Sequence, residues 1–236
     1  MYADRYPEYP EAHWEVIENG FDEENFRNAE LGIDPAPFSE SGQFTLIHSG
    51  LLYPIERDPR PFFAALSRLK NTAQIDSNSL RIVFRATGAD DLYRPMLRDM
   101  DISDIVHLAP TIGYRDALRE MLRADALLLF QGSNCDHQIP AKIYEYFRAG
   151  KPILALVGPQ GITASKLREA GVASIADMSD ADSIATNLLA LLSRLRNGDR
   201  NGVAPEVAAR NSRKSRTAEL ADILHKVVST GPERRP

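Results

Sequence analysis

A lysine and a glutamate stand three residues apart where a predicted helix begins, in the stretch IPAKIYEYFRAGKPILAL (residues 139–156). Lys142 and Glu145 lie together on one side of this helix, away from an apolar face that includes Ile143 and Phe147. At this i,i+3 spacing, the two charges can form a surface ion pair worth about 0.2–0.5 kcal/mol. They can instead form half of a ligand site.

The position of the pair favours a ligand site more than its spacing does. The helix follows the most apolar strand of the chain, ALLLFQG (126–132), through the loop QGSNCDHQ. A helix that starts after such a loop presents unpaired backbone N–H groups and a positive dipole end, and both suit an anion. Pro140 fits an early helical position, where its missing donor is harmless.

Short apolar strands and helical segments alternate from residue 43 onward. We expect strands at 44–50, 80–88, 104–110, 126–132, 152–158 and 172–177. We expect helices at 58–71, 90–100 (broken), 114–125, 139–149, 163–171, 180–198 and 217–229. Uniformly apolar strands suit a parallel sheet with helices on both faces, so the predicted fold class is α/β and Rossmann-like. A ligand would bind at the carboxyl ends of the strands, near Gly50, Gly88, Gly132 and Gly158.

Three parts are predicted along the chain. Residues 1–42 form an acidic, proline-containing N-terminal extension or interdomain linker, with a short strand at Val16 and Ile17. Residues 43–200 form the Rossmann-like domain, and residues 201–236 form a C-terminal helix and tail. The basic run 210–216 is interpreted as a solvated helix start, and contact with a phosphate-bearing partner is the alternative.

Composition excludes several classes of protein. The 236 residues are 43% hydrophobic and 26% charged, which is typical of a soluble globular chain. The net charge of −5 argues against general affinity for nucleic acid. Cys135 is the only cysteine, so a reducing, cytoplasmic location is expected. No apolar run approaches the roughly 20 residues of a spanning helix, and the first residues do not look like a signal peptide. A peripheral position at the inner membrane face stays open.

Two acidic motifs match the D-x-D spacing that can hold a divalent ion and a diphosphate, DMD (99–101) and DAD (180–182). They end and begin predicted helices, so capping and solvated charge are the expected roles. Cys135 and His137 lack a second pair of ligands and are weak evidence for zinc. The glycines match neither a P-loop nor G-x-G-x-x-G, and no G-x-S-x-G elbow is present. We therefore expect neither a metal nor another cofactor.

Four segments together resemble the C-terminal, donor-binding half of GT-B glycosyltransferases, family 4 in particular. The first three are WEVIENGFDEENF, HSGLLYPIERDPRPFFAAL and IVHLAPTIGYRDALREMLRADALLLFQG. The fourth, IPAKIYEYFRAGKPILAL, is similar to the family segment KlyEymaaGkPvia. The resemblance covers residues 14–195. It implies a nucleoside-diphosphate sugar as donor substrate, and retaining transfer of the sugar to an acceptor glycan or lipid-linked glycan.

The resemblance also implies roles for individual residues. Glu145 would accept hydrogen bonds from the ribose hydroxyls, and Gly50 would let the backbone approach the diphosphate or sugar. Arg57 is the candidate for the basic diphosphate contact, and Arg85 could also face the phosphates. Pro110 would border the base.

Near the start of the helix, Ala141 would present a backbone N–H to phosphate, and Lys142 would add a cation. His137 stands where the family has the first glutamate of its E-x7-E motif. This difference puts the sugar contact of that glutamate in doubt.

The chain starts where the second half of a GT-B enzyme starts, so we expect the acceptor domain to be missing or supplied by a separate chain. Such a half would bind a nucleoside diphosphate and would catalyse sugar transfer slowly or not at all. Two other functions stay open. One is a non-catalytic nucleotide-binding interaction module, and the other is half of a GT-B nucleotide-sugar epimerase.

Overall fold

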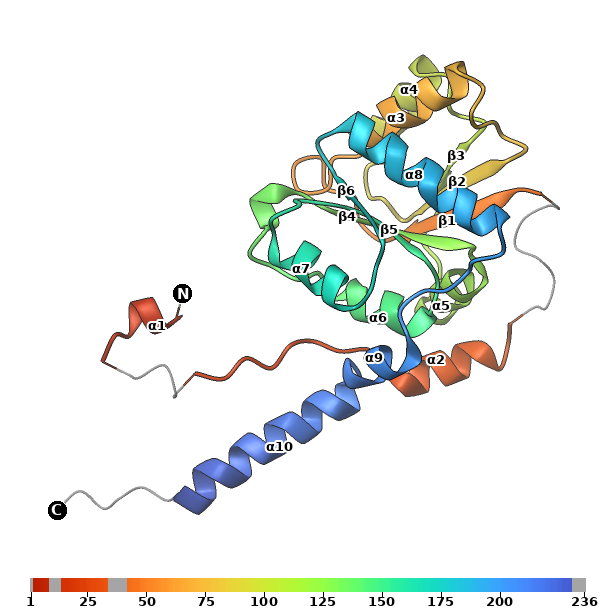
Figure 1. Cartoon of the computed structure of the whole chain (residues 1–236). Helices are drawn as coiled ribbons and strands as arrows, with labels where there is room; N and C mark the ends of the chain where they lie inside the picture. The colour runs from red at the N-terminus through yellow and green to blue at the C-terminus, as the bar shows by residue number, and fades with distance from the viewer. Residues whose placement is uncertain (1, 9–13, 34–41, 231–236) are drawn as a thin grey trace.

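The computed structural model describes residues 2–8, 14–33 and 42–230. Its centre is a sheet of six parallel strands in the order β3-β2-β1-β4-β5-β6 (Figure 1). The strands are β1 (Phe44–Ser49), β2 (Leu80–Arg85), β3 (Val106–Ala109), β4 (Ala126–Gln131), β5 (Ile153–Val157) and β6 (Ser174–Asp177). Each lies within a predicted strand, and the Rossmann-like fold class is confirmed.

Helices cover both faces of the sheet (Figure 1). The strands are connected in turn by α3 (Arg60–Asn71), α4 (Asp90–Asp99), α5 (Tyr114–Arg123), α6 (Lys142–Ala149) and α7 (Ile162–Glu169), and α8 (Ala181–Arg196) follows the last strand. The first face packs mainly against α3, α4 and α8, and the second against α5, α6 and α7. Neighbouring residues Leu46 and Ile47 enter opposite cores because successive strand side chains alternate between faces. Burial on both faces explains why the strands are apolar throughout.

Further helices lie outside this alternation: α1 (Tyr2–Arg5), α2 (Glu23–Glu30), α9 (Pro205–Arg210) and α10 (Arg213–Thr230). The second helix lies inside the predicted linker, yet it packs against α5 and buries Phe26 and Ala29. Parts of the predicted linker and tail, residues 1, 9–13, 34–41 and 231–236, lie outside the described residues. The predicted boundaries of the Rossmann-like domain, after residues 42 and 200, stay predictions.

Four expectations about secondary structure are wrong. Val16 and Ile17 form no strand, because no sheet edge lies beside them, and Val16 is 86% exposed. The helix α4 is continuous through Pro95, since its buried Tyr93 and Leu97 hold it against the sheet. The helix expected at 139–149 begins at Lys142, so Pro140 lies before its N-cap rather than in its first turn. The last helix begins at Arg213 rather than at residue 217.

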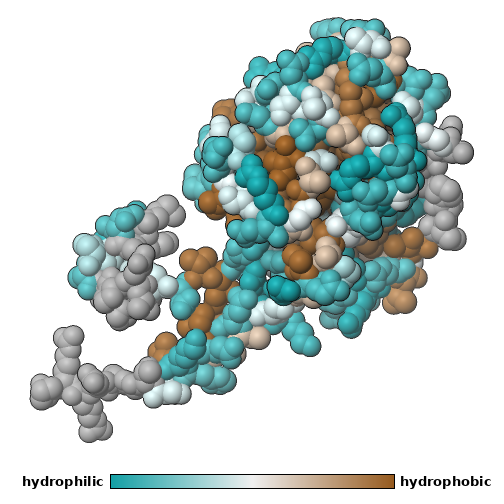
Figure 2. Space-filling view, in the orientation of Figure 1, coloured by the Kyte–Doolittle hydropathy of each residue, from teal (hydrophilic) through white to brown (hydrophobic). Residues whose placement is uncertain are grey.

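The early start of α10 has a local cause. The Ser212 hydroxyl accepts a hydrogen bond from the Ser215 backbone N–H at 3.1 Å, as a helix cap does. The helix then projects from the body of the molecule, and Figure 2 shows apolar surface in this region. Leu220, Leu224 and Val227 are exposed along it. None of the helices in the described ranges has the length and apolar character needed to cross a membrane.

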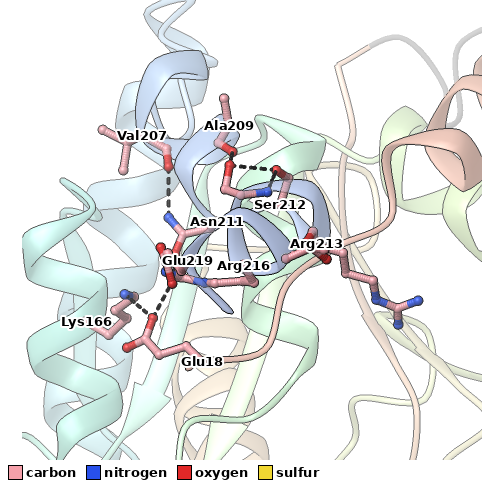
Figure 3. A network of polar contacts seen from close by, with 11 residues as sticks. Glu18, Lys166, Val207, Ala209, Asn211, Ser212, Arg213, Arg216 and Glu219 are labelled. Atoms are coloured by element: carbon pink, nitrogen blue, oxygen red, sulfur yellow. Dashed lines mark hydrogen bonds and ion pairs between the residues drawn. The ribbon is translucent and has the colours of Figure 1, made fainter. Parts of the chain in front are cut away.

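A charged network ties the N-terminal segment to two helices (Figure 3). The Glu18 carboxylate accepts from Lys166 on α7 at 2.5 Å and from Arg216 on α10 at 2.8 Å. Arg216 also donates to the Asn211 side chain at 2.9 Å and pairs with Glu219. The Glu18, Lys166 and Arg216 side chains are largely buried, so these contacts are poorly screened by solvent.

Replacing Glu18 by glutamine should lower the free energy of unfolding by about 1–3 kcal/mol, because it removes the charge from two charge-assisted hydrogen bonds. Urea unfolding followed by circular dichroism measures this change. The matched control is Glu219→Gln, whose carboxylate is 45% exposed and meets Arg216 at i,i+3 spacing. That control should change stability by no more than about 0.5 kcal/mol. Equal effects of the two variants would contradict the structural role of Glu18.

Candidate functional site

The central strands β1 and β4 separate before they end. Their paired register covers only Leu46 with Ala126 and Ile47 with Leu127. The chain then leaves β1 toward α3 on one face of the sheet and leaves β4 toward α6 on the other. Such a switch point opens a crevice at the carboxyl ends of the strands, where ligands bind in this class of fold.

A cavity of about 300 Å³ lies at this edge of the sheet. Apolar atoms make up most of its wall, and a few polar side chains reach it from different elements. It is lined by Ser49, Gly50, Arg85, Ala86, Thr111, Ile112, Tyr114, Ala117, Leu118, Met121, Lys142, Glu145 and Tyr146. An apolar cavity with a few convergent polar groups is the usual form of a small-molecule site.

Four of the predicted site residues line this cavity together, namely Gly50, Arg85, Lys142 and Glu145. Pro110 lines an adjoining hollow of about 560 Å³. Ala141 is the N-cap residue of α6 and makes no side-chain cap hydrogen bond. His137 is exposed, and its ring lies 3.2 Å from the side-chain amide of Gln138.

Separation of the strands leaves the Leu128 carbonyl to be satisfied by side chains. The ring of His48 approaches it through Nδ1 at 2.9 Å, and the Tyr146 hydroxyl donates to it at 3.0 Å. A carbonyl only accepts, so His48 Nδ1 carries the proton and His48 Nε2 is left as an acceptor. One oxygen atom therefore connects β1, β4 and α6.

The ammonium group of Lys142 lies beside this imidazole. Its Nζ donates to the Ser49 carbonyl at 2.6 Å and lies 3.3 Å from His48 Nε2. Burial, and after it the nearby charge of Arg57, lowers the pKa of Lys142 to about 7, although the charge of Glu145 acts in the opposite direction. Burial, followed by the charge of Lys142, lowers the pKa of His48 well below its usual range, so the imidazole is neutral. This edge of the sheet thus holds an amine that is partly protonated at neutral pH and has no carboxylate bonded to it.

Gly50 makes room for that cation. Its backbone has φ of +120°, which a residue with a side chain rarely adopts. A Cβ placed there would lie 3.0 Å from Lys142 Nζ. The glycine at the end of β1 is therefore needed both for the turn and for the approach of the lysine. Beside it, the Ser49 hydroxyl oxygen is buried and has no hydrogen-bond partner among the described residues.

Glu145 has a different partner from Lys142. Its Oε1 accepts a hydrogen bond of 2.6 Å from the hydroxyl of Tyr114, at the start of α5. Burial, together with the hydrogen bond to this carboxylate, raises the pKa of Tyr114, which therefore remains a donor at physiological pH. The surface ion pair that the i,i+3 spacing allows is not formed, because each side chain is turned to a residue from another element.

The two predicted arginines differ in how far their charge is already neutralised. Arg85 forms a two-pronged ion pair with Glu120, in which Nε donates at 2.8 Å, and Nη1 donates to the Pro110 carbonyl at 2.7 Å. Arg57 donates to the Leu51 carbonyl at 3.1 Å and lies 5.5 Å from the centre of the Tyr53 ring. Arg57 is therefore the freer cation, and the phosphate roles of both stay predictions.

His48, Ser49 and Tyr114 belong to the site but were not singled out from the sequence. A weak signal existed for His48, which interrupts an apolar strand just before a glycine. Tyr114 follows Gly113 after β3, a position that nothing in the sequence marks as close to Glu145.

Residues of the two acidic motifs have partners within the protein. Asp180 caps α8 by accepting from the backbone N–H groups of Asp182 and Ser183, as predicted. Asp101 pairs with Lys70. Within the described ranges, no group of three or more His, Cys, Asp or Glu side chains is placed to hold a metal ion.

Comparison with known proteins identifies solved structures that share this fold. No protein-family model and no curated protein matches the sequence. Among solved structures, sucrose-phosphate synthase from Thermosynechococcus elongatus is similar, with a TM-score of 0.66 at 10% identity over 92% of this chain. A glycosyltransferase from Rickettsia africae has a TM-score of 0.68 at 11% identity over 98% of this chain. The pneumococcal O-GlcNAc transferase GtfA, in complex with UDP and GlcNAc, has a TM-score of 0.56 at 16% identity over 83% of this chain.

The chain therefore has the fold of one half of a GT-B glycosyltransferase, and the resemblance seen in the sequence is confirmed. The chain covers 53%, 62% and 38% of the lengths of these three proteins, respectively. At such identities the likeness concerns the fold alone.

The amine of Lys142 should titrate with a midpoint near 7 in the protein without ligand, because burial opposes its charge. Carbon-13 NMR of the lysine side chains across pH 5–11 measures this midpoint, and Lys142→Met identifies the signal. Lys70, held between Asp101 and Asp104, has a raised pKa and serves as the internal control. A Lys142 midpoint close to the ordinary value of 10.5 would contradict the burial of this amine.

Proposed function

We propose that this chain is the donor-binding half of a glycosyltransferase, which binds a nucleoside-diphosphate sugar for transfer to an acceptor held by another domain. The observation that carries the proposal is the cavity at the β1–β4 switch point. It is reached both by an ammonium group without a bonded carboxylate and by a carboxylate without a bonded cation. These two groups match the diphosphate and the ribose of one ligand.

The diphosphate would lie at Gly50, between the β1 loop and the start of α6. Lys142 supplies a point charge there, and an ammonium with three donors can meet phosphate while it keeps its bond to Ser49. The positive end of α6 and the guanidinium of Arg57 add to the potential. The Ser49 hydroxyl, buried without a partner, is a further donor for the ligand.

The ribose and base would lie farther along the cavity. Glu145 can accept hydrogen bonds from two vicinal hydroxyls, which is the arrangement that ribose offers. Apolar lining from Ile112, Leu118 and Met121 suits the flat face of a base. The similar structure of GtfA contains UDP, which agrees with a nucleotide as the kind of ligand.

In sugar transfer, the leaving diphosphate gains negative charge as the bond to the anomeric carbon breaks. Preorganised cations stabilise that charge, and fixed contacts to ribose and phosphate hold the sugar in position. This chain would supply these two effects. The acceptor site and the stereochemical course, retaining by resemblance, stay predictions.

Isothermal titration calorimetry with UDP, GDP and ADP should detect binding, and Lys142→Met should weaken it about 10- to 100-fold. That range matches the loss of one charge-assisted hydrogen bond of about 1.5–3 kcal/mol. Lys214→Met removes an exposed lysine on α10 and is the matched control, with affinity unchanged.

Two results would count against the proposal. Absence of binding for all three nucleotides at millimolar concentration would overturn the donor site. Equal affinities for Lys142→Met and Lys214→Met would instead remove Lys142 from it.

A further inference from the structure

Tyr114 and Glu145 come from different helices and meet at the cavity wall. Tyr114 is the first residue of α5, after β3, and Glu145 lies in the first turn of α6, after β4. Their oxygen atoms are 2.6 Å apart, although the tyrosine side chain is 51% exposed. A short O–H···O⁻ bond of this kind is among the stronger hydrogen bonds in proteins.

Without this bond, Glu145 would have another partner within reach. Lys142 precedes it by three residues on the same helix, a spacing at which opposite charges attract. The attraction is larger beside an apolar cavity than in open solvent. A pair between them would neutralise the cation that suits phosphate and occupy the carboxylate that suits ribose.

The observed contacts hold the two charges apart. On one side, the Ser49 carbonyl and the His48 ring hold the ammonium of Lys142 at the end of β1. On the other side, the hydroxyl of Tyr114 holds the carboxylate of Glu145 toward α5. The chain thus uses three residues from other elements to hold two neighbouring charges away from a pair that their spacing favours.

We propose that Tyr114 is a positioning residue of the nucleotide site, whose hydroxyl holds Glu145 away from Lys142 so that both charges remain available to ligand. One carboxylate oxygen is bonded to Tyr114, and the other is left to accept from a ribose hydroxyl. The proposal rests on the proposed function for its ligand. The separation of the charges can be measured without any ligand.

The first test uses the free protein. In Tyr114→Phe, Glu145 loses its donor and turns toward Lys142, so the NMR midpoint of Lys142 should move to higher pH. Besides Glu145, the groups that face this amine are His48 and the Ser49 carbonyl on β1 and Arg57 in the following loop, and they are unchanged. Adding Glu145→Gln to Tyr114→Phe should reverse the shift, because the amide carries no charge.

The second test uses the tightest binder among UDP, GDP and ADP, together with its 2′-deoxy form. Wild type should bind the ribonucleotide better than the deoxynucleotide. Tyr114→Phe should reduce that preference about threefold to tenfold, and it should change the affinity for the deoxynucleotide less. Tyr93→Phe is the matched control, because its buried hydroxyl donates to the Leu52 carbonyl at 2.8 Å and lies outside the cavity. It should leave both the preference and the Lys142 midpoint unchanged.

The outcomes separate the two proposals. If wild type prefers the ribonucleotide, and Tyr114→Phe alters neither that preference nor the Lys142 midpoint, then Tyr114 is not a positioning residue, although the donor site stands. If wild type binds none of the nucleotides, the donor site falls, and the role of Tyr114 in it falls as well. A reduced preference together with a raised midpoint supports the proposal. A shift that Tyr93→Phe reproduces would overturn it.

Discussion

The site depends on the early separation of the two central strands. Because β1 and β4 stop pairing after Leu127, the carbonyl of Leu128 has no partner in the ladder and takes two side-chain donors instead. Those donors fix the tautomer of His48 and the position of α6 through Tyr146. The Nε2 atom of His48 then faces Lys142, and the cavity lies in the crevice between the diverging loops. A requirement to satisfy one buried acceptor therefore organises residues from three elements.

The charged groups of the cavity lower the stability of the fold, although they suit the binding of a ligand. A buried lysine beside a neutral imidazole and near an arginine is unfavourable in the empty protein. Pairing it with Glu145 would relieve that penalty, but the structure holds the two groups apart. Arg85 and Glu120 show the opposite solution a short distance away, where a partly buried ion pair is complete. Functional sites are where such locally unfavourable arrangements are expected to persist.

Much of the fold follows from the sequence, because apolar strands and amphipathic helices report burial directly. The alternation predicted all six strands of the described sheet, and the predicted glycine at the end of β1 lines a cavity at the carboxyl edge of the sheet. The pattern around Lys142 and Glu145 likewise predicted a helix at the right place, although the helix begins at Lys142 rather than at residue 139. What the sequence lacked was the partner of each charge, since Ser49, His48 and Tyr114 reach them across the fold. The wrong strand at Val16 and Ile17 has the same origin, because local apolar character cannot reveal whether a neighbouring edge exists.

The contacts of Glu18 have a mechanical consequence. The segment before α2 and the helix α10 lie far apart in sequence, yet the Glu18 carboxylate of that segment is bonded to α10 as well as to α7, and Phe21 also bridges to Ser212. A movement of either segment would therefore act on the other and on α7. Arg148 on α6 also pairs with Glu23 and Glu30 of α2, and α6 packs against α9, so this corner is connected to the helix that carries Lys142 and Glu145.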